Sequence, residues 1–295
     1  MPESLQNIKI QRLVNFSPSD TPVDILRLDL LHPVVSGNKW FKLRYYLEEA
    51  VSTGKTKVAT FGGAWSNHIV ATAFAAGEAG LSSVGLIRGD ETTPLSPALQ
   101  DARKYGMELV FVDREAYRDK EALKCSLDQP GTYWIMEGGY GQNGAKGAGE
   151  ILHTVDTSEY THILCAVGTG TMIAGLINTA ATTQKIEGVS VLKNHLGLEK
   201  EIRALLSNPD SDRFHLHHAY HFGGYAKQTP VLFDFMKDLW TRQLIPTDLV
   251  YTAKLLFATK ELLTDNYFPA TSRLLVIHSG GLQGNRSLPA GKLPF

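Results

Sequence analysis

Two lysines three residues apart, Lys39 and Lys42, follow the turn signal Ser36-Gly37-Asn38. At this spacing they share one face of a helix that begins at the turn. A lysine held at a helix start in a partly desolvated site can lose its proton and condense with an aldehyde. The alternative is an ordinary amphipathic helix with an exposed charged face. The run therefore predicts a lysine nucleophile only if other segments supply a matching ligand site.

A second segment with chemical potential is Gly168-Thr169-Gly170-Thr171, which lies between an apolar run and an apolar helical pattern. Its glycines let the backbone close on an anion, toward which the amides of the helix start point. Dinucleotide binding requires a third glycine where Ile173 stands, and the Gly-Lys-Ser/Thr triplet of nucleoside triphosphate loops is missing. The segment predicts a single phosphate and disfavours a dinucleotide-dependent oxidoreductase. A glycine turn without a ligand is the alternative.

Polar side chains also follow two other apolar runs. Ser66, Asn67 and His68 come after a pair of glycines at a predicted strand end. They can hold a carboxylate or an oxyanion through side chains and amides, although a plain helix cap at Ser66 explains the same pattern. Ser279 follows the apolar run 274–278. A hydroxyl at that place faces the ligand crevice of an open α/β sheet.

The elements that position these segments alternate along the chain. Runs typical of strands cover 57–61, 83–87, 108–112, 132–136, 162–167, 189–193 and 274–278. Helical patterns cover 66–80, 97–105, 114–125, 145–155 and a segment from 171. This alternation predicts an α/β protein with parallel sheets covered by helices on both faces. We expect a large cofactor-binding domain of residues 1–48 and 147–295 and a small domain of residues 49–146.

Composition excludes several classes of partner. The 295 residues carry a formal net charge of −1, which favours neither nucleic acid nor a membrane surface. The two cysteines, Cys125 and Cys165, have no metal-like spacing and fit a reducing compartment. The histidines at 215, 217, 218 and 221 lack an acidic or cysteine partner nearby, so we expect no metal. With no long apolar stretch and no apolar signal core, the expectation is a soluble cytoplasmic protein.

Pyridoxal 5'-phosphate has an aldehyde, a phosphate and a ring nitrogen that a protein must bind. A lysine at a helix start, a phosphate-binding loop and the hydroxyl of Ser279 match these three groups. On segments 37–43, 62–68 and 168–171, the chain resembles the 1-aminocyclopropane-1-carboxylate deaminase and D-cysteine desulfhydrase family. That family has the tryptophan-synthase-β-like fold of pyridoxal phosphate enzymes. The resemblance extends from about residue 30 to residue 284. It implies a two-domain, open, twisted parallel-sheet fold, pyridoxal 5'-phosphate as cofactor, a small amino acid as substrate and a homodimer.

The resemblance also implies roles for individual residues. Lys39 matches the lysine that bonds covalently to the cofactor, and Lys42 matches a lysine near the cofactor phosphate. Asn67 matches the partner of the ring hydroxyl. Ser66 matches a serine that contacts the substrate carboxylate and has been proposed as a catalytic group, and His68 lies beside it in the substrate site.

Other matches lie in the second half of the chain. Tyr225 and Tyr251 match active-site tyrosines, either of which can protonate a leaving group. Thr252 and Ser279 match positions at the pyridine nitrogen. The phosphate loop corresponds to Gly168, Thr169, Gly170 and Thr171.

One departure from the family bears on the substrate. Deaminases that open the cyclopropane ring carry glutamate directly after the tyrosine at 251, where this chain has Thr252. An anion there keeps the ring nitrogen protonated and the ring a strong electron sink. A neutral Thr252 with Ser279 is closer to D-cysteine desulfhydrases.

We therefore expect a deaminating lyase or hydrolase that removes an α-proton, eliminates a β-substituent and releases a keto acid and ammonia. Cyclopropane-ring opening, giving α-ketobutyrate and ammonia, is the alternative. An alternative of another class is a cofactor- or ligand-binding protein without efficient turnover.

Overall fold

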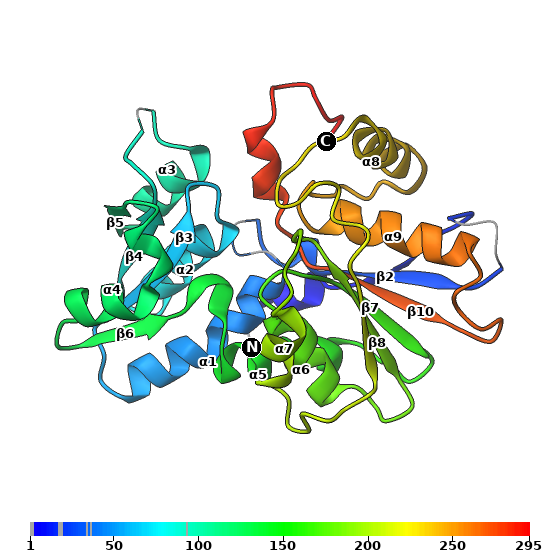
Figure 1. Ribbon diagram of the computed structural model, residues 1–295, viewed down its shortest axis with the longest axis horizontal. Coiled ribbons are helices and arrows are strands. Elements are labelled where there is room, and N and C mark those ends of the chain that lie inside the picture. Colours follow the sequence, from blue (N-terminus) through cyan, green and yellow to red (C-terminus); the bar gives the residue numbers. More distant parts are fainter. Residues whose placement is uncertain (1–2, 17–19, 34, 36, 93) are drawn as a thin grey trace.

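The computed structural model describes residues 3–16, 20–33, 35, 37–92 and 94–295, and its strands form two sheets (Figure 1). In order across the six-stranded sheet, the strands are β1 (Ile10–Arg12), β2 (Val23–Arg27), β10 (Leu274–His278), β7 (His162–Val167), β8 (Lys185–Ser190) and β9 (Phe214–His217). The four-stranded sheet consists of β5 (Met107–Val112), β4 (Ser82–Arg88), β3 (Lys57–Gly63) and β6 (Thr132–Ile135). All neighbours pair in parallel except β1 with β2. The predicted α/β class is confirmed.

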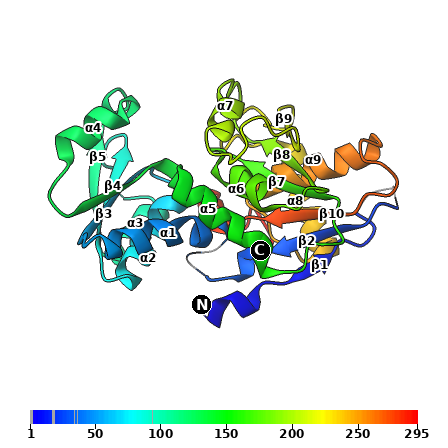
Figure 2. The same cartoon turned by 90° about the horizontal axis from the view of Figure 1, so that it is seen from below.

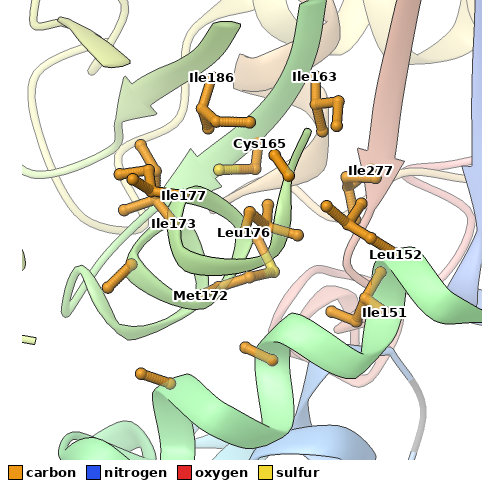
Figure 3. Close-up of a cluster of buried hydrophobic side chains, with 14 of the residues drawn as sticks. Ile151, Leu152, Ile163, Cys165, Met172, Ile173, Leu176, Ile177, Ile186 and Ile277 are labelled. Carbon is orange, nitrogen blue, oxygen red and sulfur yellow. The ribbon is translucent and has the colours of Figure 1, made fainter. Parts of the chain in front are cut away.

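Helices cover both faces of the six-stranded sheet (Figure 2). One face packs against α5 (Gln142–Gly149), the 3-10 helix η5 (Glu150–Thr154) and α6 (Thr171–Thr179), and the other against α8 (Pro230–Gln243) and α9 (Thr252–Thr264). Alternate side chains of β7 point to opposite faces of the six-stranded sheet. Ile163 and Cys165 point toward α6 (Figure 3), whereas Leu164 and Ala166 pack among side chains of α9. All residues of β7 are buried, as expected of a parallel strand covered on both sides.

Helices also cover both faces of the four-stranded sheet. The helices α1 (Asn38–Ser52), α2 (Asn67–Glu78) and α3 (Pro97–Lys104) pack on one face, and the 3-10 helix η3 (Ala116–Arg118) and α4 (Lys120–Leu127) on the other. The first residue of α1 lies beside the six-stranded sheet, because the Asn38 amide donates to the Ser279 carbonyl at 3.2 Å. From there α1 runs along the four-stranded sheet and so joins the two halves of the fold (Figure 1).

Several predicted boundaries differ from the observed ones. The run 189–193 contains only the end of β8, which begins at Lys185. The pattern 114–125 is two helices, because the Asp119 side chain accepts the Ala122 amide at 2.9 Å and starts α4 afresh. The chain also contains α7 (Leu198–Arg203) and a C-terminal 3-10 helix, η6 (Leu282–Ser287). The division of the chain at residues 48 and 147 stays a prediction.

Within the described residues, none of the helices combines the length and the apolar character needed to cross a bilayer.

Candidate active site

A cavity of about 450 Å³ lies where both sheets present the carboxyl ends of their strands. In open parallel sheets ligands bind at these ends. The segments that follow β3, β6, β7 and β10 all contribute to its wall. Of the residues singled out from the sequence, the cavity brings together Lys39, Lys42, Ser66, Asn67, His68, Gly168, Thr169, Gly170, Tyr225, Tyr251 and Ser279. Thr171 and Thr252 are fully buried and do not line it.

The two lysines reach the cavity from the first turns of α1. Burial lowers the pKa of Lys39 to about 8, and the charge of Asp248 acts in the opposite direction. Burial and then the charge of Lys39 lower the pKa of Lys42 well below its ordinary value. Lys39 Nζ donates to Asn38 Oδ1 at 3.0 Å, and Lys42 Nζ to the Gly138 carbonyl at 3.4 Å. Lys39 therefore loses its proton more readily than an exposed lysine, as a nucleophile must.

Gly37 fixes where α1 begins. Its φ of 67° lies in the left-handed region, and a Cβ there would stand 1.8 Å from the Ser279 carbonyl oxygen. Only glycine tolerates both conditions, so the approach of the helix start to the segment after β10 depends on it. Ser36, the first residue of the predicted turn signal, lies outside the described residues.

The segment after β7 forms an anion cradle at the start of α6. Gly170, with φ of 77°, is the N-cap of this nine-residue helix, whose first amides have no partner within the helix. The hydroxyls of Thr169 and Thr171 lie 3.0 Å apart, so Thr171 supports the wall from behind. Gly138 closes the cradle, since a Cβ on it would lie 2.9 Å from the Thr169 methyl group.

The start of α2 presents polar groups to the same cavity. Ser66 is the N-cap, and its Oγ accepts the Ile69 amide at 3.4 Å. Asn67 Nδ2 donates to the Gly281 carbonyl at 3.1 Å, whereas Asn67 Oδ1 is buried without a partner. A buried acceptor without a partner at a cavity wall indicates a ligand that donates a hydrogen bond.

The protonation of His68 follows from its neighbours. The Thr60 hydroxyl donates its one proton to the Ile135 carbonyl at 2.8 Å, so it accepts from His68 Nε2 at 2.8 Å. Burial and then the charges of Lys39 and Lys42 lower the pKa of His68 well below its ordinary value. The ring is therefore neutral, and its Nδ1, buried without a partner, is an acceptor.

Tyr225 and Tyr251 meet edge to face, with ring centroids 6.4 Å apart and planes at 77°. Tyr251 precedes α9, whereas Tyr225 comes from the loop between β9 and α8. Burial raises the pKa of both hydroxyls, that of Tyr251 well above its ordinary value. Both tyrosines therefore keep their protons at neutral pH and can act as donors.

The acid Asp248, which sequence reasoning missed, lies fully buried in front of α9. Its Oδ2 accepts the amides of Val250 and Tyr251 at 2.8 and 2.9 Å. Its Oδ1 accepts the amide and the hydroxyl of Thr252 at 2.8 and 2.7 Å. The resemblance implied that Thr252 would line the cavity beside Ser279. Its bonds to Asp248 explain why it does not. An aspartate just before a helical pattern is a cap signal, and it was available in the sequence.

We expect Thr252→Glu to destabilise the protein. The change places a second carboxylate against Asp248 in a fully buried position, which costs about 3–5 kcal/mol of unfolding free energy. Urea unfolding of the cofactor-loaded protein measures this loss, with Thr252→Val as the matched control that removes the hydroxyl without adding charge. Unchanged stability together with a shifted cofactor spectrum would instead place residue 252 at the ring nitrogen.

Other charged and histidine side chains lie at two further places. Arg88 and Glu137, to which the sequence analysis gave no role, line the cavity from the ends of β4 and β6. Away from it, His217 Nε2 lies 2.8 Å from Glu187 Oε2, and its ring meets that of His215 at 4.7 Å. Among the described residues no three histidine, cysteine or acidic side chains form a group that could hold a metal ion.

Known proteins share this fold over nearly its whole length. The family model described as pyridoxal-phosphate dependent enzyme matches residues 8–280. A Thermotoga maritima protein with the provisional name 1-aminocyclopropane-1-carboxylate deaminase is 31% identical over 88% of this chain and 88% of its own. The bifunctional mitochondrial D-cysteine desulfhydrase/1-aminocyclopropane-1-carboxylate deaminase of Arabidopsis thaliana is 28% identical over 90% of this chain and 74% of its own. A crystal structure described as "the ACC deaminase homologue" superposes with a TM-score of 0.79 at 28% identity, over 95% of this chain and 90% of that chain.

Fold, cavity and family model together define a pyridoxal-phosphate dependent enzyme. Within that class, the chain belongs to the 1-aminocyclopropane-1-carboxylate deaminase and D-cysteine desulfhydrase family. Both the predicted family and the predicted cofactor are confirmed.

Proposed function

We propose that the protein is a D-cysteine desulfhydrase-like enzyme that deaminates a small amino acid by eliminating a β-substituent. For D-cysteine, the reaction with one water gives pyruvate, ammonia and hydrogen sulfide. We choose β-elimination over opening of the cyclopropane ring because the cavity wall at Ser279 carries no charge. Ser279 lines the cavity, whereas the oxygens of the buried acid nearby, Asp248, accept hydrogen bonds from four donors. A ring nitrogen that meets a hydroxyl makes a weaker electron sink than one that meets a carboxylate.

The cavity wall fits pyridoxal 5'-phosphate group by group. Lys39, with its pKa lowered to about 8, suits the covalent bond to the aldehyde. The free amides of the α6 start around Gly170 suit the phosphate. Lys42 would serve as counter-charge, because a bound phosphate anion raises the pKa that burial and Lys39 lower in its absence. The unpartnered Oδ1 of Asn67 accepts what the ring hydroxyl donates. When bound, the cofactor supplies an electron sink for the charge left after α-proton removal.

Residues of the chain bind the substrate and move its protons. Ser66 and the amides of the α2 start hold the substrate carboxylate, where the positive end of the helix dipole favours an anion. The Lys39 amine, which faces the cavity and has its pKa lowered to about 8, would take the α-proton. Tyr225 or Tyr251, both protonated at neutral pH, gives a proton to the departing thiolate.

The substrate assignment is tested by supplying D-cysteine and 1-aminocyclopropane-1-carboxylate separately to the purified protein. We expect sulfide and pyruvate from the first and no α-ketobutyrate from the second. The name of the Thermotoga maritima relative favours ring opening, whereas the name of the Arabidopsis thaliana relative includes both activities. α-Ketobutyrate without sulfide would establish it and refute the elimination. Cofactor binding without turnover of any D- or L-amino acid would favour a ligand-binding protein.

Cofactor capture by the cofactor-free protein is expected to accelerate with rising pH up to about 8 and then level off. The nucleophile is the neutral amine of Lys39, whose pKa burial lowers to about 8. Below that value its neutral fraction falls about tenfold per pH unit. Stopped-flow absorbance between pH 6 and 10 measures the second-order rate constant. A rise that continues to pH 10, as for an exposed lysine, would contradict the burial effect.

A further inference from the structure

Lys254 is a buried cation for which the proposed reaction has no use. It is the third residue of α9 and is fully buried. Its Nζ donates to the carbonyls of Gly224 and His221 at 2.8 and 2.9 Å, and a third carbonyl, that of Val191, lies at 3.5 Å. Burial lowers the pKa of Lys254 to about 8 while the charge of Asp248 raises it, so the ammonium form prevails at neutral pH. A buried ammonium is retained only where its hydrogen bonds offset the loss of hydration.

The carbonyls that Lys254 binds belong to a strained loop. Residues 222 to 224 and 226 all have left-handed backbone, with φ of 51° at Phe222, 90° at Gly223, 122° at Gly224 and 53° at Ala226. Glycine adopts such a backbone freely, but at Phe222 and Ala226 it persists only where surrounding contacts over-determine it. Two carbonyls of this loop, those of His221 and Gly224, point to the ammonium, and each also accepts a backbone amide of the loop, from Gly224 at 2.9 Å and from Lys227 at 3.3 Å. Without Lys254 each carbonyl would lose its charge-assisted hydrogen bond. The ammonium therefore ties the loop to α9 through two charge-assisted hydrogen bonds.

Tyr225 sits in the middle of this loop, directly after one of the bound carbonyls. Tyr251 lies three residues before Lys254, on the same face of the α9 start. One helix thus carries one cavity tyrosine and, through its lysine, holds the loop that carries the other. We propose that Lys254 is a positioning residue that sets Tyr225 against Tyr251 at the cavity wall. The inference rests on the proposed function only for its kinetic consequence, since the placement itself is structural.

Hydrogen exchange of the cofactor-loaded protein tests the placement without any need for turnover. Lys254→Met keeps the length and apolar stem of the side chain and removes the donors. We expect peptides within 219–228 to exchange at least tenfold faster, with other segments unchanged. Lys260→Met, at a partly buried lysine of the same helix, is the matched control and should exchange like the wild type. Equal exchange in Lys254→Met and wild type overturns the proposal. If Lys254→Met does not fold, Lys254→Gln replaces it. Its neutral amide lacks the charge of the ammonium, so we again expect faster exchange within 219–228, and exchange equal to that of the wild type overturns the proposal.

A double-mutant cycle with Tyr225→Phe tests the catalytic consequence. Misplacing a reacting group by about 1 Å costs about 100-fold in rate, so Lys254→Met should lower kcat about 100-fold and leave KM within about twofold. In the Tyr225→Phe background the same change should cost less than about threefold, because there is no hydroxyl left to misplace. A loss of the same size in both backgrounds shows that Lys254 acts on stability alone and overturns the proposal.

The two hypotheses fail in different ways. A wild-type protein that turns over none of the amino acids refutes the proposed function, and the exchange measurement still decides the placement. Normal exchange in an active Lys254→Met variant refutes the placement and leaves the proposed function standing.

Discussion

Lys39→Ala protein is expected to lose turnover by about 10³-fold or more and to lose the visible absorbance of its covalently bound cofactor. The reason is the position of this amine. It faces the cavity from the α1 start, burial lowers its pKa to about 8, and its one hydrogen-bond partner among the described residues is the neighbouring Asn38. In the proposed mechanism a single group serves as covalent anchor and as base, so alanine would remove both functions at once.

The comparison with Lys42 sharpens this expectation, because the two lysines share a helix face and a cavity. Lys42→Ala should weaken cofactor binding and retain the visible absorbance at saturating cofactor, since it removes a counter-charge rather than the bond. Borohydride reduction followed by peptide mapping identifies the modified lysine directly. A cofactor label on Lys42 instead of Lys39 would refute the assignment.

Most of the site could be predicted because its residues follow strand ends. Glycines at the end of β3 and directly after β7 mark where the backbone turns, and such local signals can be recognised in a sequence. The strand β2 was not predicted from the sequence because two of its five residues, Asp24 and Arg27, are charged. Both are buried, and ion pairs with Arg12 and Asp29 compensate their charges. Because these ion-pair partners lie outside β2, the residue pattern of the strand itself does not reveal that its charges are compensated.

The spacing of residues in the sequence could not predict which side chains at the α9 start point into the cavity. Residue 252 follows Tyr251 directly, but successive residues of a helix start point about 100° apart. The tyrosine therefore reaches the cavity while the threonine turns inward to Asp248. That acid organises the tyrosine, the threonine and, through its charge, the proton affinity of Lys39.

Removal of this acid is expected to have a large effect on both stability and protonation. Asp248→Ala leaves the amides of Val250, Tyr251 and Thr252 without their buried acceptor, which should lower the free energy of unfolding by about 3 kcal/mol. The negative charge also raises the pKa of Lys39, so its loss should move that pKa below about 8. The pH at which cofactor capture levels off must then shift downward.

The matched control is Asp265→Ala, which removes an exposed acid at the opposite end of the same helix. A negative charge there opposes the helix dipole, so its removal should leave stability within about 0.5 kcal/mol of the wild type or raise it slightly. Urea unfolding and the pH dependence of cofactor capture, measured on both variants, separate the two effects of Asp248. A destabilised Asp248→Ala protein with an unshifted capture profile would mean that the acid shapes the helix start but does not act on the lysine. A shifted profile with unchanged stability would mean that its charge acts on Lys39 while the four hydrogen bonds contribute little net stability.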